Sequence, residues 1–222
     1  VATPPLGFSF SGWTDAEIKT TLNAIPEMVT PSIEIKKETS LYAVFSITNS
    51  NCVETDLSSV AKTDDVIIAI SKDDEYYAMS QEKGSSGQPL TKELMVSNGK
   101  ITSAISDDMK WNIAYDKGDM VIYPAGDDES WLYCTSGSNN NAVRIGTNAD
   151  NNIFEMKSVE IDDVVYSNYL YNKATERFVG AYYDNEVAVD WRAYKLTASG
   201  AFPTNIKDQT YHFFKSEGKS FY

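Results

Sequence analysis

The sequence is poor in the side chains that most enzymes use for nucleophilic or metal chemistry, with one histidine and two cysteines in 222 residues. A Ser–His–Asp or Cys–His arrangement would have to use His212, and neither Cys52 nor Cys134 has a catalytic motif around it. One histidine and two cysteines are also few ligands for a transition-metal site. No phosphate-binding glycine loop or dinucleotide fingerprint is present. We therefore expect no catalytic residues, no cofactor and no metal.

Basic residues and long apolar runs are also scarce. The chain has 19 Lys and Arg against 32 Asp and Glu, a net charge of −13, which argues against nucleic acid and anionic membrane as partners. No apolar run approaches the roughly eighteen residues of a membrane-spanning helix, so we expect no membrane insertion. We expect a soluble monomer. Because the chain starts at Val1, we also expect that an upstream segment has been removed.

Two cysteines are too few for a disulfide scaffold. Cys52 and Cys134 could form one bridge, but their separation in sequence says nothing about their distance in space. We favour two thiols over a disulfide.

The informative feature that is present is one pattern in three copies. Each copy has an apolar run, a polar and mostly acidic turn, and a second apolar run, at residues 66–79, 120–134 and 168–180. Each copy then closes on an aromatic–x–apolar strand. Three all-β units of roughly fifty residues predict a β-trefoil-like barrel with a shared aromatic core. The six rings expected there are Tyr77, Trp131, Phe178, Trp111, Phe154 and Tyr211.

Residues 1–50 differ in composition from the rest, and we place a domain boundary near Asn51, with the β-trefoil-like domain at residues 51–222. Strands are predicted at residues 8–13, 32–36 and 39–45, and a helix start at residues 14–18. The motif residues Gly7, Phe8, Phe10, Gly12, Trp13, Thr39, Leu41, Tyr42 and Ala43 resemble the Listeria–Bacteroides repeat of internalin B-repeat type. That resemblance implies a small β-grasp-like module of a surface protein, used for display or adhesion.

A second set of motif residues lies at positions 131–135, 143–147, 190–194 and 205–213. Through these residues, the segment from about Asp64 to Lys215 is similar to an uncharacterised β-rich module of secreted and surface proteins of gut Bacteroidales. The similarity implies a secreted or cell-surface protein, and it assigns no residue a function.

Carboxylates are plentiful, and most of them fall in predicted hairpin turns. They are Asp73, Asp74, Glu75, Asp107, Asp108, Asp127, Asp128, Glu129, Asp162, Asp163, Asp184 and Glu186. Turn geometry and solubility are the expected roles. Calcium bound by one such cluster is an alternative, and paired carboxylates could also hydrolyse a glycosidic bond.

The best binding candidate combines arginine with aromatic residues. Arg144 and Arg192 are predicted at the same strand of successive units. Aromatic rings stack on the apolar faces of sugars, while Arg and Asp form hydrogen bonds with hydroxyls. The predicted contacts are Trp191, Arg192, Tyr194, Asp190 and Tyr182, with Trp131 and Arg144 second. In the alternative interpretation the two arginines form structural salt bridges. The lectin-type Gln–x–Trp signature is missing, since residues 209–211 only approximate it.

The sequence therefore predicts an extracellular, non-catalytic binding or adhesion module, with a glycan or a surface protein as partner. One alternative is a structural spacer that makes protein contacts only, with Trp191 in the core and no concave site near Arg192. The other is a small glycoside hydrolase that uses two carboxylates.

Overall fold

The structure, a computed structural model, describes residues 9–17, 27–29, 40–46, 52–137 and 141–216. This part of the chain is all-β, as the sequence predicts. Its strands are β1 (Ser9–Thr14), β2 (Tyr42–Ser46), β3 (Cys52–Glu54), β4 (Val66–Lys72), β5 (Glu75–Lys83), β6 (Pro89–Leu94), β7 (Val96–Ser97), β8 (Lys100–Ile101), β9 (Lys110–Asp116), β10 (Asp119–Pro124), β11 (Trp131–Cys134), β12 (Val143–Gly146), β13 (Phe154–Ile161), β14 (Val164–Asn172), β15 (Arg177–Asp184), β16 (Val187–Tyr194) and β17 (Thr210–Ser216).

The helical segments of the described residues are four short 3-10 turns. They are η1 (Leu57–Ser59), η2 (Asp107–Met109), η3 (Ala149–Asn151) and η4 (Thr204–Ile206). A helix with the length and hydropathy to cross a bilayer is not found in the described ranges.

The first two strands form a sheet of their own. β1 and β2 pair antiparallel, with an irregularity between Phe10 and Gly12. They correspond to the strands predicted at residues 8–13 and 39–45. Of the predicted helix start, Thr14 ends β1 and accepts a hydrogen bond from the Ala16 amide at 3.2 Å. Ile18, together with the strand predicted at residues 32–36, lies outside the described residues.

From β3 onward most strands belong to one large sheet, and β11 and β12 pair separately. The pairings follow the three units predicted from the repeats, which comprise β4–β9, β10–β13 and β14–β17. The last strand of each unit pairs with the first strand of the next, in the pairs β9–β10, β13–β14 and β17–β4. Within units, β4 pairs with β9, β10 pairs with β13, and β14 lies beside β17. Six strands therefore follow one another in a closed circuit.

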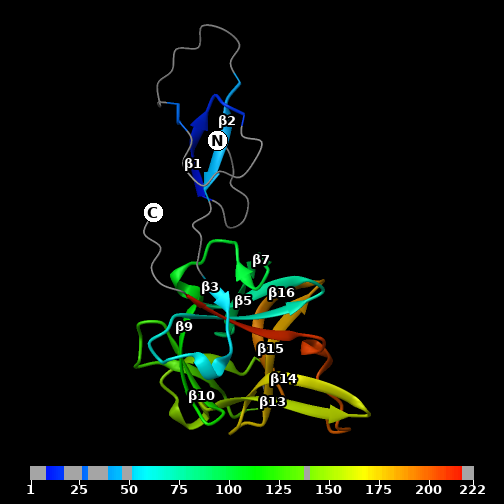
Figure 1. The fold of residues 1–222 in the computed structure, drawn as a ribbon. Helices are drawn as coiled ribbons and strands as arrows, with labels where there is room; N and C mark the ends of the chain where they lie inside the picture. The colour runs from blue at the N-terminus through cyan, green and yellow to red at the C-terminus, as the bar shows by residue number, and fades with distance from the viewer. Residues whose placement is uncertain (1–8, 18–26, 30–39, 47–51, 138–140, 217–222) are drawn as a thin grey trace.

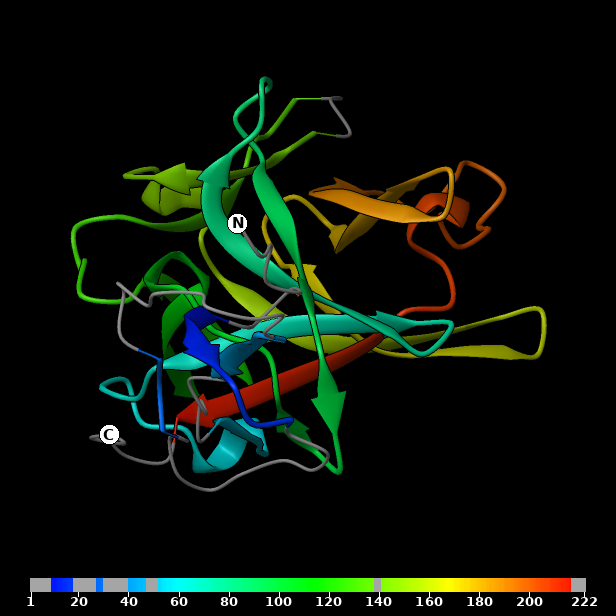
Figure 2. The ribbon, with the colours of Figure 1, turned by 90° about the horizontal axis from the view of Figure 1, so that it is seen from above.

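The remaining strands of each unit include a hairpin, namely β5–β6, β11–β12 and β15–β16. Between hairpins, the backbone ladders have one pair each, where Asp190 pairs with Leu90 and Asn141 bridges to Ala193. Figure 2 shows β17 running beside β4 and the β13–β14 hairpin projecting from the side of the large sheet. The same projection is visible in Figure 1.

Tight turns explain where the hairpins reverse. Asp73 and Asp74 have φ of 52° and 65°, and Asp162 and Asp163 have φ of 52° and 63°. Two successive residues with positive φ form the hairpin turns that match the twist of the strands, and Asp tolerates this region better than most residues. The predicted turn role is confirmed for these four acids. No group of three or more His, Cys, Asp or Glu side chains among the described residues is placed to hold a metal ion.

The main core contains alternate residues of the six circuit strands, together with residues of the hairpins. Trp111, Ile113, Met120, Ile122 and other side chains of this cluster are 0% exposed. Successive strand residues point to opposite faces, so this alternation directs one face of each strand inward. β4 is buried on both faces, because its other side chains pack in a second cluster with Phe214 and Leu94.

The six predicted core rings do not all share one interior. Trp111, Phe154 and Tyr77 belong to the main core, and Tyr211 packs against it. Phe178 instead lies in a third cluster with Tyr169, Tyr194, Phe202 and Ile206. The physical reason is the chain between β16 and β17, which brings Phe202 and Ile206 against β15. Trp131 is half-buried and donates its indole N–H to the Asn148 carbonyl at 2.7 Å.

Candidate functional site

The leading site residue predicted from the sequence, Trp191, lies in the core. Its side chain is 0% exposed, belongs to the main core cluster, and has its ring 5.8 Å from that of Tyr211. An external sugar cannot stack on a ring that is fully covered, so the predicted contact from Trp191 is wrong. Alternation along a strand separates two faces, but it does not tell which face the rest of the fold will cover.

Asp190, Arg192 and Tyr182 do form a cluster, and Gln88 completes it. The Arg192 guanidinium donates to both Asp190 oxygens, at 2.6 and 3.1 Å, and its central carbon lies 3.5 Å from the centre of the Tyr182 ring. Gln88 Nε2 donates to Asp190 Oδ2 at 2.5 Å. The Asp190 side chain is only 4% exposed. These contacts match the alternative of a structural salt bridge, because both carboxylate oxygens are already bonded inside the protein.

Tyr194 and Arg144 also have structural surroundings. Tyr194 is 5% exposed and packs in the third cluster. Arg144 lies in β12 and Arg192 in β16, the third strand of their units, as predicted. The Arg144 guanidinium donates to the carbonyls of Asn141 and Val143, and its side chain runs past Gly87. Arg144 is therefore bonded to the residues that lead into and begin its own strand.

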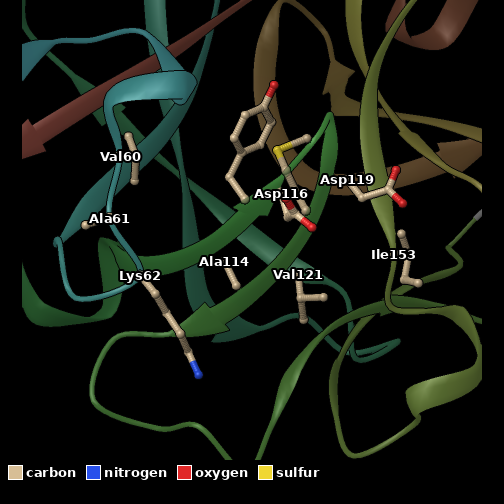
Figure 3. Close-up of a pocket in the computed structure, with 10 residues that line it drawn as sticks. Val60, Ala61, Lys62, Ala114, Asp116, Asp119, Val121 and Ile153 are labelled. Carbon is tan, nitrogen blue, oxygen red and sulfur yellow. The ribbon is translucent and has the colours of Figure 1, made fainter.

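A hollow of about 430 Å³ lies instead over the outer face of the β9–β10 hairpin (Figure 3). Ala114 and Val121 form its floor, and they are direct partners in the ladder. Val60 and Ala61 form one wall and Ile153 the other. We call it the β9–β10 hollow. Its volume lies in the range of roughly 300–1,000 Å³ that is typical of small-molecule sites.

Charged side chains stand at the two sides of the apolar floor. Lys62 lies at one side, and Asp116 and Asp119 at the other (Figure 3). The Lys62 ammonium is 4.5 Å from the centre of the Tyr123 ring, a favourable contact between a cation and the electron-rich face of the ring. Asp119 Oδ1 accepts a hydrogen bond from Lys173 Nζ at 2.7 Å, which raises the pKa of Lys173.

The local sequence explains why the two acids share this side. Lys117 and Gly118 have φ of 51° and 98° and form a two-residue hairpin turn. Asp116 and Asp119 flank that turn as direct ladder partners, so their side chains lie on the same face as those of Ala114 and Val121. Lys62 comes from the segment between η1 and β4, far away in sequence.

The aromatic positions that repeat between units do not indicate this site. The Asp–Lys–Gly–Asp turn at residues 116–119 could have indicated that Asp116 and Asp119 stand side by side. No local pattern indicates that Lys62 and Ile153 join them, since long-range pairing decides those neighbours.

A second hollow, of about 310 Å³, lies between β13, β14 and β15. Lys157, Lys195 and Glu176 border it, and the Lys157 ammonium lies 3.9 Å from the centre of the Tyr171 ring. Neither hollow is bordered by Asp190, Arg192 or Tyr182.

Comparison with models of known protein families gives no match, and no curated protein matches the chain significantly. The two resemblances noted from the sequence therefore rest on their motif residues.

Proposed function

We propose that this chain is a carbohydrate-binding module of a secreted or cell-surface protein, and that the β9–β10 hollow binds the saccharide without catalysis. The observation that carries the proposal is the combination, in one hollow, of an apolar floor with charged groups at both sides. The C–H face of a pyranose fits the floor of Ala114 and Val121. The carboxylates of Asp116 and Asp119 accept hydrogen bonds from hydroxyls, and the Lys62 ammonium donates to ring or hydroxyl oxygens.

We infer a β-trefoil-like barrel as the scaffold, with β1 and β2 as part of a β-grasp-like module. Support for the barrel comes from the closed circuit of six strands and from the hairpin inside each unit. Support for the module is the antiparallel pairing of its two motif strands. In this arrangement the β9–β10 hollow lies where the first unit joins the second.

The test is a glycan array followed by calorimetric titration of the strongest saccharide. Ala114→Arg fills the floor with a long charged side chain, and we expect it to weaken binding at least tenfold, a loss of about 1.4 kcal/mol or more. Val165→Arg is the matched control, because Val165 is 59% exposed and lies on the projecting hairpin. Absence of any saccharide binding by the folded protein, or equal weakening by both variants, would overturn the proposal.

The structural-spacer alternative is favoured by one observation, the complete burial of Trp191. On that alternative the folded protein binds no saccharide on the array.

The hydrolase alternative is supported by Asp116 and Asp119, which lie opposite each other in one hollow. Release of reducing sugar by the wild type, lost in Asp116→Asn but kept in Asp163→Asn, would establish hydrolysis instead.

A further inference from the structure

The only histidine of the chain bridges a serine and a glutamate on neighbouring strands. His212 Nε2 lies 2.9 Å from Ser71 Oγ, and His212 Nδ1 lies 2.7 Å from Glu54 Oε1. His212 points away from the main core that Tyr211 and Phe213 face, as alternation along this strand predicts. The order of atoms, hydroxyl to Nε2 and Nδ1 to carboxylate, is that of a serine nucleophile with its base and its orienting acid.

The register of three strands brings these side chains together. In the ladders of β17, His212 is opposite Ala69 of β4, and Phe214 is opposite Glu54 of β3. Alternate residues of a strand share a face, so Ser71 and Glu54 both lie diagonally next to His212 on one face. Their positions in sequence, at 54, 71 and 212, contain no local motif.

The imidazole is held in place by its neighbours. The Tyr76 ring lies 5.0 Å from it, and the Phe214 ring stacks against it at 6.1 Å. The His212 side chain is 13% exposed and that of Glu54 is 45% exposed. Glu54 is anchored through its backbone, whose N–H donates to the Gly99 carbonyl at 2.8 Å. The chain of hydrogen bonds is therefore fixed but still borders solvent.

We propose that Ser71 is a nucleophile for acyl transfer from small carboxylic esters, with His212 as general base and Glu54 as positioning residue. Ser71 Oγ attacks the ester carbonyl carbon, His212 Nε2 takes the hydroxyl proton, and the carbonyl oxygen becomes an oxyanion. Collapse of this intermediate breaks the bond to the alcohol, which leaves with the proton from His212. Water then attacks the acyl-serine, His212 takes its proton, and the acid leaves as Ser71 recovers that proton.

This activity goes beyond saccharide binding and uses none of the residues of the β9–β10 hollow. A fluorophosphonate probe tests it directly on the wild-type protein, because such probes phosphonylate activated serines. Peptide mass spectrometry of the folded, labelled protein should find the adduct on Ser71. An adduct elsewhere only, or no adduct, would overturn the proposal without any variant.

Hydrolysis of p-nitrophenyl acetate supplies the second measurement. Ser71→Ala should abolish both labelling and the enzyme-dependent rate, and His212→Gln should lower the rate by about a hundredfold or more. Ser97→Ala, an exposed serine of β7, is the matched control and should keep the wild-type rate. A Ser71→Ala variant that hydrolyses the ester as fast as the wild type would refute the assignment.

A positioning role for Glu54 is tested by measuring kinetic quantities that a purely structural role would leave unchanged. Glu54→Gln should lower kcat with little change in KM and should slow labelling of Ser71, while the thermal midpoint stays near that of the wild type. Glu93→Gln changes an exposed acid of β6 and is the control. A Glu54→Gln variant with unchanged kcat would remove Glu54 from the mechanism.

Discussion

The side-chain amide of Gln209 pairs with the backbone of Ala181 as a neighbouring β-strand would. Its Oε1 accepts from the Ala181 N–H at 3.0 Å, and its Nε2 donates to the Ala181 carbonyl at 2.6 Å. Ala181 lies in β15 and is fully buried, and Gln209 is 5% exposed. The side chain of Gln209 therefore provides hydrogen-bond partners for two buried backbone groups, the N–H and the carbonyl of Ala181.

Gln209→Ala should lower the free energy of unfolding by about 2–4 kcal/mol, because two buried backbone groups lose their partners. Chemical denaturation measures this loss. Gln81→Ala is the control, since Gln81 makes one hydrogen bond, to the Lys110 carbonyl, in a half-exposed place. Equal losses of unfolding free energy in the two variants would show that the two hydrogen bonds to Ala181 stabilise the fold no more than the hydrogen bond of Gln81.

Gly180 is expected to tolerate no side chain. A β-carbon at this position would lie 2.7 Å from Ile206 Cβ and 2.8 Å from Gln209 Oε1. Gly180→Ala should therefore destabilise the protein by about 1–3 kcal/mol through overpacking. Gly137→Ala is the control, because a β-carbon there meets nothing within 4 Å. A thermal midpoint of Gly180→Ala that equals that of Gly137→Ala would contradict the prediction.

Asp108 should make stability depend on pH at the acid end. Burial acts to raise the pKa of its carboxyl, but hydrogen bonds from Lys92, Ser106 and Ser80 outweigh burial and lower the pKa to about 2. A pKa lower in the folded than in the unfolded chain stabilises the fold above the unfolded value of 3.8. That stabilisation, about 2 kcal/mol, is lost as pH falls from about 4 to about 2.

Unfolding free energies measured from pH 6 to pH 2 test this expectation. Asp108→Asn should have a shallower loss of stability in that window than the wild type. Lys92→Met should act in the same direction, because Lys92 Nζ is 2.6 Å from Asp108 Oδ2. Parallel curves for the wild type and Asp108→Asn would rule out this contribution.

Trp191 and Trp131 should differ in their effect on stability. Trp191→Ala empties a site in the main core and should cost about 3–5 kcal/mol. Trp131→Ala should cost less, because Trp131 is half-buried in a two-stranded sheet. Urea denaturation followed by circular dichroism compares the two. A smaller loss for Trp191→Ala than for Trp131→Ala would contradict the burial described.

Both cysteines should react only after unfolding. Cys52 is 4% exposed and Cys134 is 0% exposed, in different core clusters, and burial raises the pKa of the Cys134 thiol to about 12. A thiol reagent should find two thiols in non-reducing denaturant and almost none in the native protein, because the thiolate is the reactive form. Fewer than two thiols in denaturant would reveal a disulfide.

Much of the local structure follows from short-range patterns. The apolar–acidic–apolar copies coincide with strand–turn–strand segments. Asp73 and Asp74 form the turn inside the first copy, between β4 and β5, and Asp162 and Asp163 form the turn between β13 and β14. Trp111 and Phe154 lie in the same core cluster, and each belongs to the last strand of its unit. The local pattern does not decide the place of Trp191, because an aromatic residue at a strand position is equally compatible with a core and with a binding surface.

The chain by itself determined the all-β class and the place of most turns, because strand alternation and turn chemistry act between residues close in sequence. Only the tertiary structure decided that Trp191 is buried, that Lys62 borders the same hollow as Asp116 and Asp119, and that Glu54, His212 and Ser71 form one chain of hydrogen bonds. These neighbours are set by the register between distant strands, and a shift of one residue would turn each of them to the opposite face.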